Sequence, residues 1–200
     1  MNDHGNHTLR LVAIQGSVRP GNYTAKALAV VADAVRQQGR ASLEIIDPTD
    51  MDLRLPGRGT SDDVRQMQEI VATADGVILA TPEYHGSFSS VTKLLIDNLG
   101  FPSKLSGKPV ALLGVASGRI GALKALEHLR SVASHVGGLV LPGPVSIARV
   151  RTVFDEDGRI LDEDAAAMIR RVPTSLIDYI NRHVCPAFTL EAMVRLKTEG

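Results

Sequence analysis

A polar loop follows the first apolar run of the chain and carries groups that suit a phosphate. It reads Gly16-Ser17-Val18-Arg19-Pro20-Gly21-Asn22-Tyr23-Thr24. Its glycines permit close backbone approach, its hydroxyl and amide side chains can hydrogen-bond, and Arg19 adds a full charge. A helix that starts near Asn22 would direct N–H groups and a partial positive charge into the same space. The loop therefore suits a phosphate; a polar capping loop with one solvated arginine is the alternative.

The spacing of this loop excludes two common phosphate-binding motifs. Gly16 and Gly21 match the ends of a P-loop, but Asn22 replaces the essential lysine and Tyr23 replaces the metal-binding hydroxyl. The dinucleotide fingerprint GxGxxG is absent as well. Asp47 lies near the end of the second apolar run, where we expect a solvated strand-end carboxylate rather than a ribose ligand.

Two further loops carry unusual residues. The longer one reads Thr81-Pro82-Glu83-Tyr84-His85-Gly86-Ser87-Phe88-Ser89-Ser90. Its exposed backbone groups could hydrogen-bond to the edge of a planar polar ring. Tyr84 could stack on such a ring; the alternative is that it is a partly buried surface tyrosine. The other loop, Ser117-Gly118-Arg119-Ile120-Gly121, offers a hydroxyl, a flexible backbone and the start of a helix.

Apolar runs and helical periodicity predict the elements that position these loops. Runs at 9–14, 43–46, 76–80, 109–115 and 138–141 predict five buried strands. Helices are expected from near Asn22 to Gly39, and at 62–73, 91–99, 122–136 and 162–181, with a long loop at 47–60. Alternating strands and helices indicate a parallel sheet covered on both faces. Ligands bind at the carboxyl ends of such strands, where the three loops would converge on one flat, phosphorylated ligand.

The composition excludes several classes of function. Lys plus Arg number 22 and Asp plus Glu number 22, so no basic excess favours nucleic acid. The single cysteine, Cys185, allows no internal disulfide and no CxxC cluster, which fits a reduced cytoplasm. No secretory signal is visible, and no apolar run approaches the ~18 residues of a membrane span. His128 and His135 share a helix face without nearby carboxylates, so no metal site is expected.

The chain resembles the NAD(P)H-dependent FMN reductases, a branch of the flavodoxin-like flavoproteins, from about residue 9 to 180. The family carries G-S-x-R-x-x-S-x-N after its first strand, matched by the loop at Gly16. It carries P-E-Y-N/H-x-S after the third strand, matched most specifically by the loop at Pro82. A turn of the form S-G-x-x-G matches the loop at Ser117. Asn22 stands where the family usually has serine, and Thr24 where it usually has asparagine.

The resemblance implies a flavodoxin-like three-layer α/β sandwich, with a five-stranded parallel sheet in the order 2-1-3-4-5. It implies one FMN-binding domain over residues 1–182, with a tail at 183–200 that packs on the surface or on a partner subunit of a homodimer or homotetramer. The implied phosphate ligands are Ser17, Arg19, Asn22, Tyr23 and Thr24. The implied contacts of the isoalloxazine ring are Pro82, Glu83, Tyr84, His85, Gly86, Ser87, Ser117, Gly118 and Arg119.

The implied activity is an FMN-dependent NAD(P)H oxidoreductase. NADPH or NADH would dock transiently, and hydride would pass through FMN to a small acceptor such as a flavin, a quinone, an azo compound or a metal oxyanion. The flavin carries the redox chemistry, so no side chain is nominated as catalytic. The alternatives are an FMN-dependent dehydrogenase of one metabolite, a flavin electron carrier and a phosphate-binding module without flavin. Arg149 and Arg151 are expected to be a solvated pair; contact with a partner or with a cofactor phosphate is the alternative.

Overall fold

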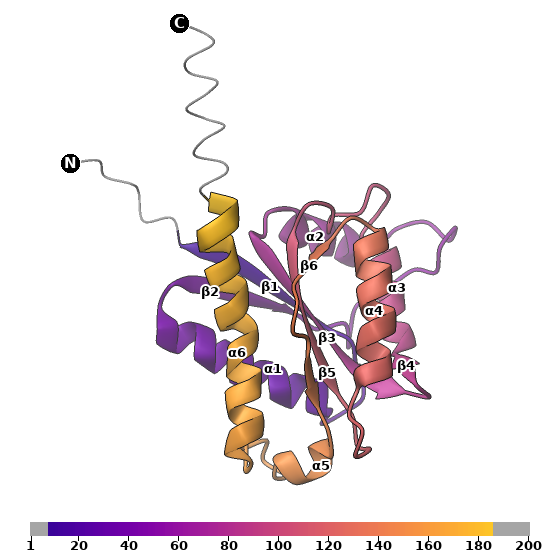
Figure 1. Cartoon of the computed structure of the whole chain (residues 1–200). Helices are drawn as coiled ribbons and strands as arrows, with labels where there is room; N and C mark the ends of the chain where they lie inside the picture. The colour runs from indigo at the N-terminus through magenta and orange to yellow at the C-terminus, as the bar shows by residue number, and fades with distance from the viewer. Residues whose placement is uncertain (1–7, 186–200) are drawn as a thin grey trace, which may run out of the picture.

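A computed structural model describes residues 8–185 of the chain as an α/β sandwich built on a mainly parallel sheet (Figure 1). The sheet order is β2-β1-β3-β5-β6, and two short strands pair beside this path, β4 with β3 and β7 with β5. Leaving out β4, a hairpin strand, the order is the expected 2-1-3-4-5. The strands are β1 (Leu9–Gln15), β2 (Ala41–Ile46), β3 (Gly76–Tyr84), β4 (Ser87–Phe88), β5 (Pro109–Val115), β6 (Leu139–Val140) and β7 (Val145–Ile147).

Helices cover both faces of the sheet because side chains alternate along each buried strand. In β1, Leu11 packs in the core under α1 (Tyr23–Gln38) and α6 (Glu163–Tyr179), whereas Val12 packs on the opposite face. That second core also holds side chains of α2 (Asp62–Ala72), α3 (Ser90–Asp97) and α4 (Leu123–His135). Figure 1 shows the two helical layers on either side of the strands. The expected three-layer architecture is confirmed.

The end of the third strand differs from the prediction. Residues 81–84, expected to begin a loop, continue β3 and turn back into the antiparallel strand β4. His85 (φ 51°) and Gly86 (φ 77°) form the two-residue connection, and positive φ at both positions is the geometry of a type I′ hairpin turn. Hairpin turns of this kind are usually marked by Asn-Gly or Asp-Gly, so His-Gly gave only a weak signal.

The carboxyl-terminal part of the fold contains two more unpredicted features. The expected strand at 138–141 is present as the short strand β6, and β7 is an additional strand; the two pair with successive parts of β5. A short helix, α5 (Val150–Val153), follows β7. After α6 the chain continues as a π-helical turn, Ile180–Val184, which crosses the expected domain boundary at 182. The expected tail lies mostly outside the described residues. No helix in the described range is long and apolar enough to cross a membrane.

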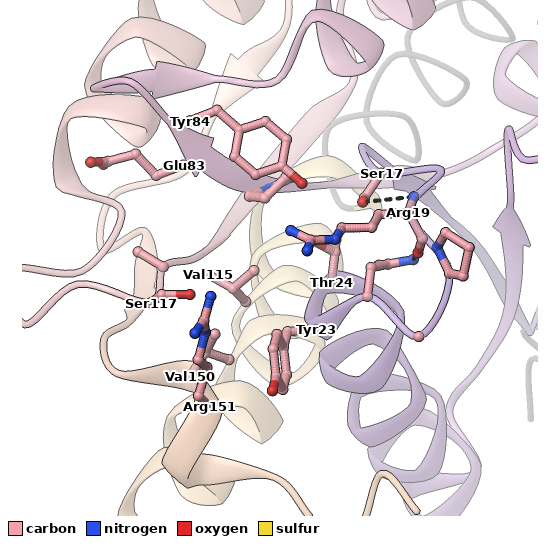
Figure 2. Close-up of a pocket in the computed structure, with 15 residues that line it drawn as sticks. Ser17, Arg19, Tyr23, Thr24, Glu83, Tyr84, Val115, Ser117, Val150 and Arg151 are labelled. Atoms are coloured by element: carbon pink, nitrogen blue, oxygen red, sulfur yellow. Dashed lines mark hydrogen bonds between the residues drawn. The ribbon is translucent and has the colours of Figure 1, made fainter. Parts of the chain in front are cut away.

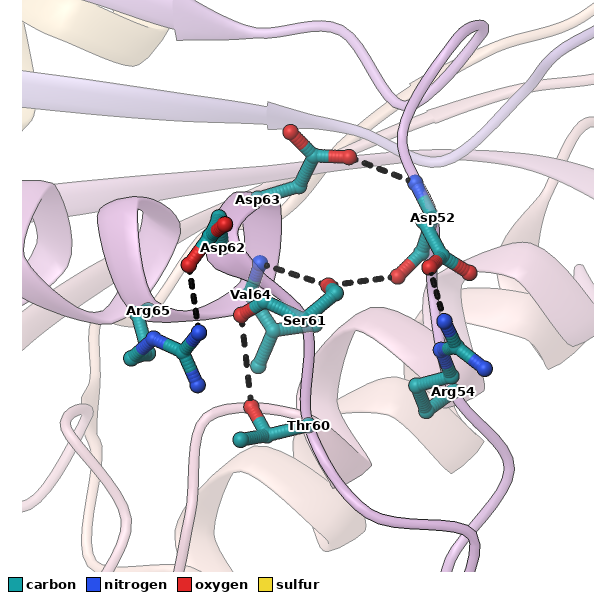
Figure 3. A network of polar contacts seen from close by, with 8 residues as sticks. All are labelled: Asp52, Arg54, Thr60, Ser61, Asp62, Asp63, Val64 and Arg65. Carbon is teal, nitrogen blue, oxygen red and sulfur yellow. Dashed lines mark hydrogen bonds and ion pairs between the residues drawn. The ribbon is translucent and has the colours of Figure 1, made fainter.

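The long loop before α2 is fixed by a polar network (Figure 3). Ser61 caps the helix by accepting a hydrogen bond from the Val64 N–H at 3.1 Å, and its hydroxyl donates to the Asp52 carbonyl at 2.7 Å. The Asp63 carboxylate in turn accepts from the Asp52 N–H at 2.8 Å. Ion pairs of Asp52 with Arg54 and of Asp62 with Arg65 flank the cap.

Lys108 precedes β5 and links its start to α2, at the end of the sheet opposite to the three loops. Its ammonium group donates to the carbonyls of Ala72 (2.9 Å) and Ala74 (2.7 Å), at the end of α2. Burial lowers the pKa of Lys108 and the charge of Asp75 partly opposes this shift. The two carbonyls account for a cation buried at this position.

Candidate functional site

A cavity of about 440 Å³ lies at the carboxyl ends of β1, β3 and β5, where the three loops meet. Figure 2 shows the side chains that surround it. Nine of the predicted site residues line this cavity: Ser17, Arg19, Asn22, Tyr23, Thr24, Pro82, Glu83, Tyr84 and Ser117. Five others do not line it: His85, Gly86, Ser87, Gly118 and Arg119. The unpredicted lining residues are Pro20, Gly21, Val115, Ala116, Val150 and Arg151.

The loop after β1 wraps the start of α1. The Asn22 side chain is the helix cap: its oxygen accepts from the Ala25 N–H at 2.8 Å, and its amide donates to the Arg19 carbonyl at 2.9 Å. Ser17 is buried, and its hydroxyl accepts weakly from the Arg19 N–H at 3.4 Å. Asn22 therefore braces the loop, which differs from the direct ligand role implied for it by resemblance.

Thr24 holds a buried hydroxyl that has no hydrogen-bond partner among the described residues. The residue is 1% exposed and lines the cavity. A buried polar atom without a partner costs free energy, so it points to a missing ligand group at this place. The first N–H groups of α1 lack intrahelical acceptors by the geometry of a helix start, and they add donors beside this hydroxyl.

The β3–β4 hairpin forms the second wall. Pro82 and Glu83 lie in β3, and Tyr84, which is 44% exposed, presents its ring to the cavity (Figure 2). Glu83 points away from the cavity, toward the start of α4, where its carboxylate accepts from the Ala125 N–H at 3.3 Å. Because α4 has no side-chain cap of its own, this contact supports its first turn.

The hairpin tip lies outside the cavity because it is fastened to α4. The Ser87 hydroxyl is 3.0 Å from Nδ1 of His128. A Cβ placed at Gly86 would stand 3.6 Å from the Lys124 side chain, so the hairpin backbone runs close to that helix. His85, Gly86 and Ser87 are thus placed to hold the hairpin in position rather than to touch the contents of the cavity.

The third wall joins the end of β5 to α5. The Val150 N–H donates to the Ala116 carbonyl, and the Arg149 N–H donates to the Gly118 carbonyl, both at 3.0 Å. These bonds bring Arg151 and Ser117 to one side of the cavity (Figure 2), while Gly118 and Arg119 are not among its lining residues. Arg149 and Arg151 are both exposed, as expected of a solvated pair, and Arg151 in addition lines the cavity. The local sequence around Arg151 did not place it at the cavity, because the position of α5 depends on the pairing of β7 with β5.

A buried hydroxyl network lies behind the first two walls. The Ser89 hydroxyl donates to the Gly16 carbonyl at 2.5 Å and is 2.9 Å from the Thr92 hydroxyl. The Thr92 hydroxyl donates to that of Thr81 at 3.0 Å. A Cβ at Gly16 would clash with the Thr92 hydroxyl and stand 2.7 Å from the Ala80 carbonyl, so glycine is required here. The network joins the loop after β1 to the base of the hairpin.

The cavity is electropositive. Arg19 and Arg151 both line it, and neither takes part in an ion pair with another described residue. Within residues 8–185, no cluster of histidine, cysteine and carboxylate side chains could hold a metal ion. Glu83, the carboxylate residue among the lining, directs its side chain toward the Ala125 N–H, so the remaining donors and positive charge suit an anionic organic ligand rather than a cation.

Similar structures agree with this fold. The flavoenzyme FerB, an NAD(P)H:acceptor oxidoreductase from Paracoccus denitrificans, superposes with a TM-score of 0.74 at 23% identity, covering 88% of this chain and 98% of that one. A flavodoxin from Archaea gives a TM-score of 0.59 at 11% identity, covering 87% of this chain and all of the flavodoxin. At these identities the likeness shows the flavodoxin-like fold alone.

Similar sequences go further. An NAD(P)H-dependent FMN reductase of Pseudomonas aeruginosa is 32% identical over 180 residues, which cover 87% of this chain and 96% of that protein. An NADPH azoreductase of a Bacillus species is 36% identical over 118 residues, 59% of this chain and 64% of the azoreductase. The family model for NADPH-dependent FMN reductase matches residues 9–152, and the chain therefore belongs to that family.

Proposed function

We propose that the chain is an FMN-dependent NAD(P)H oxidoreductase. Hydride passes from NADPH or NADH through bound FMN to a small acceptor such as a flavin, a quinone, an azo compound or a metal oxyanion. The observation that carries this proposal is the buried, unpartnered Thr24 hydroxyl in an electropositive cavity at the start of α1. Family membership supports the flavin, and the names of the azoreductase and of a 2-hydroxy-1,4-benzoquinone reductase from a Burkholderia species support the range of acceptors.

The phosphate of FMN fits the wall built by the loop after β1. Its oxygens would accept from the Thr24 and Ser17 hydroxyls and from the first N–H groups of α1, with Arg19 supplying charge. Tyr23 lines the same wall, where its ring packs 6.3 Å from that of Phe154. Asn22 contributes by holding the loop in shape through its two hydrogen bonds.

The ring of FMN fits between the hairpin wall and the end of β5. Pro82, Glu83, Tyr84 and Ser117 line this part of the cavity and would contact it. His85, Gly86 and Ser87 would act indirectly through the hairpin, and Gly118 through its hydrogen bond to α5. Arg119 is exposed at the rim, outside the cavity.

FMN, when bound, supplies the group that accepts and donates hydride. The residues of this chain bind it, orient it and shield one side of it. Backbone N–H groups at the cavity would stabilise negative charge on the reduced ring, because fixed dipoles need not reorganise during the reaction. No side chain is required to move a proton for hydride transfer, and none is assigned as catalytic.

The visible absorption spectrum tests this proposal. We expect the purified protein to bind FMN, show the flavin bands, and lose them on anaerobic addition of NADPH or NADH. Addition of a quinone should then restore the bands. A protein that stays colourless after incubation with FMN would overturn the flavin assignment. A flavin that only a partner protein reduces would instead indicate an electron carrier.

Assembly and location complete the proposal. We propose a homodimer or homotetramer, supported by the exposed apolar side chains of Ile120 (72%) and Leu123 (51%) beside the Ser117 loop. Light scattering should give a mass of two or four chains, and a monomer at all concentrations would contradict it. A cytoplasmic location, a single domain over residues 1–182 and a surface-packed tail at 183–200 belong to the same proposal. Cell fractionation and a chain shortened to residue 182 would test them.

A further inference from the structure

Two arginines line the cavity on different walls. Arg19 lies on the wall at the start of α1, and Arg151 lies beside Ser117 on another wall (Figure 2). Glu83, the carboxylate residue that lines the cavity, directs its side chain toward the Ala125 N–H. In the described chain neither guanidinium has an ion-pair or hydrogen-bond partner. Each guanidinium is therefore available to an anionic group of a ligand, one at the start of α1 and the other beside Ser117.

Arg151 lies on α5, a short helix whose position is fixed by buried side chains and backbone hydrogen bonds. Val150 and Val153, its neighbours on α5, are 2% and 3% exposed. Two backbone hydrogen bonds of 3.0 Å tie the start of α5 to the loop after β5. Arg149 adopts a left-handed conformation (φ 47°), which residues other than glycine seldom adopt. With this turn, Val150 is buried and Arg151 lines the cavity. Residues with such unusual backbone conformations cluster at ligand sites.

The proposed function accounts for the anionic group that Arg19 would bind. The phosphate of FMN belongs at the helix start, beside Thr24, Ser17 and Arg19. Arg151 is on the wall that faces the ring, where the hydride donor must approach. The donor itself carries phosphate groups, and guanidinium groups bind phosphate in a fork geometry.

We propose that Arg151 binds a phosphate group of the nicotinamide donor. The proposal rests on the proposed function and deepens it by naming the residue that recognises the donor. Both donors carry a pyrophosphate, and NADPH alone carries the 2′-phosphate. The shared chemistry is a phosphate bound by a guanidinium, and comparison of the two donors identifies which phosphate it is.

The test compares Arg151→Ala and Arg151→Lys with a matched control, Arg159→Ala. Arg159 is an exposed arginine near α5 that does not line the cavity, so its loss removes the same charge from the same region. The measurements are KM and kcat for NADPH and NADH, calorimetric binding of NADP⁺ and NAD⁺ to the FMN-loaded protein, and the Kd for FMN.

In Arg151→Ala we expect KM for NADPH and Kd for NADP⁺ to rise roughly tenfold, the loss of one charged hydrogen bond. The value of kcat should hold, because an interaction made equally in ground and transition states affects KM. Arg151→Lys should recover part of the loss, and Arg159→Ala should resemble wild type. An equal rise for NADH indicates the pyrophosphate, and a rise for NADPH alone indicates the 2′-phosphate.

Three results would overturn the inference. NADP⁺ and NAD⁺ affinities that stay unchanged in Arg151→Ala would show that the guanidinium does not bind the donor. A loss of FMN affinity with unchanged NADP⁺ and NAD⁺ affinity would assign Arg151 to the flavin. An equal effect in Arg159→Ala would mean that the overall positive charge of this region, and not a contact of Arg151, attracts the donor. Failure of the proposed function looks different: wild-type protein would then neither oxidise NAD(P)H nor bind NADP⁺ or NAD⁺, and both proposals would fail together.

Discussion

The Thr24 hydroxyl would favour ligand binding but lowers the stability of the fold without ligand. It is buried and without a partner among the described residues, which disfavours the ligand-free fold. The same hydroxyl lies at the start of α1, where a phosphate oxygen would satisfy it. A side chain kept at this cost in the empty site is typical of a binding residue.

Thr24→Val tests this conflict with a side chain of nearly the same shape. We expect the ligand-free variant to be about 1 kcal/mol more stable, because the buried hydroxyl is removed. That corresponds to a rise in Tm of roughly 2–4 °C for a chain of this size. FMN binding should weaken by about 1.5 kcal/mol, roughly tenfold. Thermal denaturation and fluorescence titration measure the two effects, and Thr24→Ser, which keeps the hydroxyl, is the control. A less stable variant with unaltered FMN affinity would contradict this account.

Arg19 is the residue proposed to bind the same phosphate through its charge. Arg19→Ala should weaken FMN binding by about 1.5–3 kcal/mol, and the exposure of this side chain places the effect at the lower end. Riboflavin, which lacks the phosphate, should bind the variant and the wild type equally well. Fluorescence titration with both flavins measures the difference. Equal losses for FMN and riboflavin would mean that Arg19 shapes the loop instead of binding the phosphate.

Residue types in the three loops predicted much of the candidate site, and topology decided the rest. Ser17, Arg19 and Thr24 could be named because a glycine-rich loop before a helix has one common use. Arg151 was considered as a contact of a cofactor phosphate but was not chosen as a site residue, since its place depends on β7 pairing with β5 across a long stretch of sequence. Asn22 was chosen as a ligand and lines the cavity, and its side chain also caps α1 and braces the loop, a role that its place before the helix did not reveal.

At the scale of elements, the loop after β1 and the β3–β4 hairpin are joined by Ser89. Its hydroxyl caps α3 by accepting from the Thr92 N–H at 3.0 Å and donates to the Gly16 carbonyl at 2.5 Å. One side chain therefore fixes the helix that follows the hairpin against the loop proposed to hold the phosphate. The distance between the two ends of the flavin site depends on this contact.

Ser89→Ala should lower both stability and FMN affinity. Loss of the cap and of the bond to a buried carbonyl should cost about 1–3 kcal/mol of unfolding free energy. FMN affinity should also fall several-fold because the loop is less fixed; about 1 kcal/mol corresponds to a factor of five. Ser61→Ala is a matched control: this serine caps α2 and donates to the Asp52 carbonyl in the same way (Figure 3). It should lose stability alone. Equal FMN losses in both variants would mean that the effect is general destabilisation.

The hairpin itself marks the limit of prediction for elements. Periodicity identified the buried part of β3, but not its extension through Pro82 to Tyr84. Proline is disfavoured inside strands, and here it is accommodated where the pairing of β3 with β5 ends, opposite Val115. The helices were placed more closely, because Asn22, Ser61 and Asp162 cap α1, α2 and α6 as their residue types indicate.

At the scale of the molecule, the order of strands and helices predicted the fold. Each run was short and mostly apolar, as in strands covered on both faces, and helical runs separated them. Right-handed crossovers then leave few topologies, and the observed order β2-β1-β3-β5-β6 is the expected one. The same topology gathers the ends of β1, β3 and β5 around one cavity.

One cavity for donor and acceptor has a kinetic consequence. Its volume, about 440 Å³, is within the range of a site for one ligand, and FMN would occupy it. No second dinucleotide-binding unit is present among residues 8–185, so donor and acceptor must use the same exposed side of the ring in turn. We expect ping-pong kinetics, with parallel lines in double-reciprocal plots of rate against NADPH at several quinone concentrations. The oxidised donor should inhibit competitively against the quinone, since both bind the reduced enzyme. Lines that intersect would instead require donor and acceptor to be bound together, and the acceptor would then need a separate site.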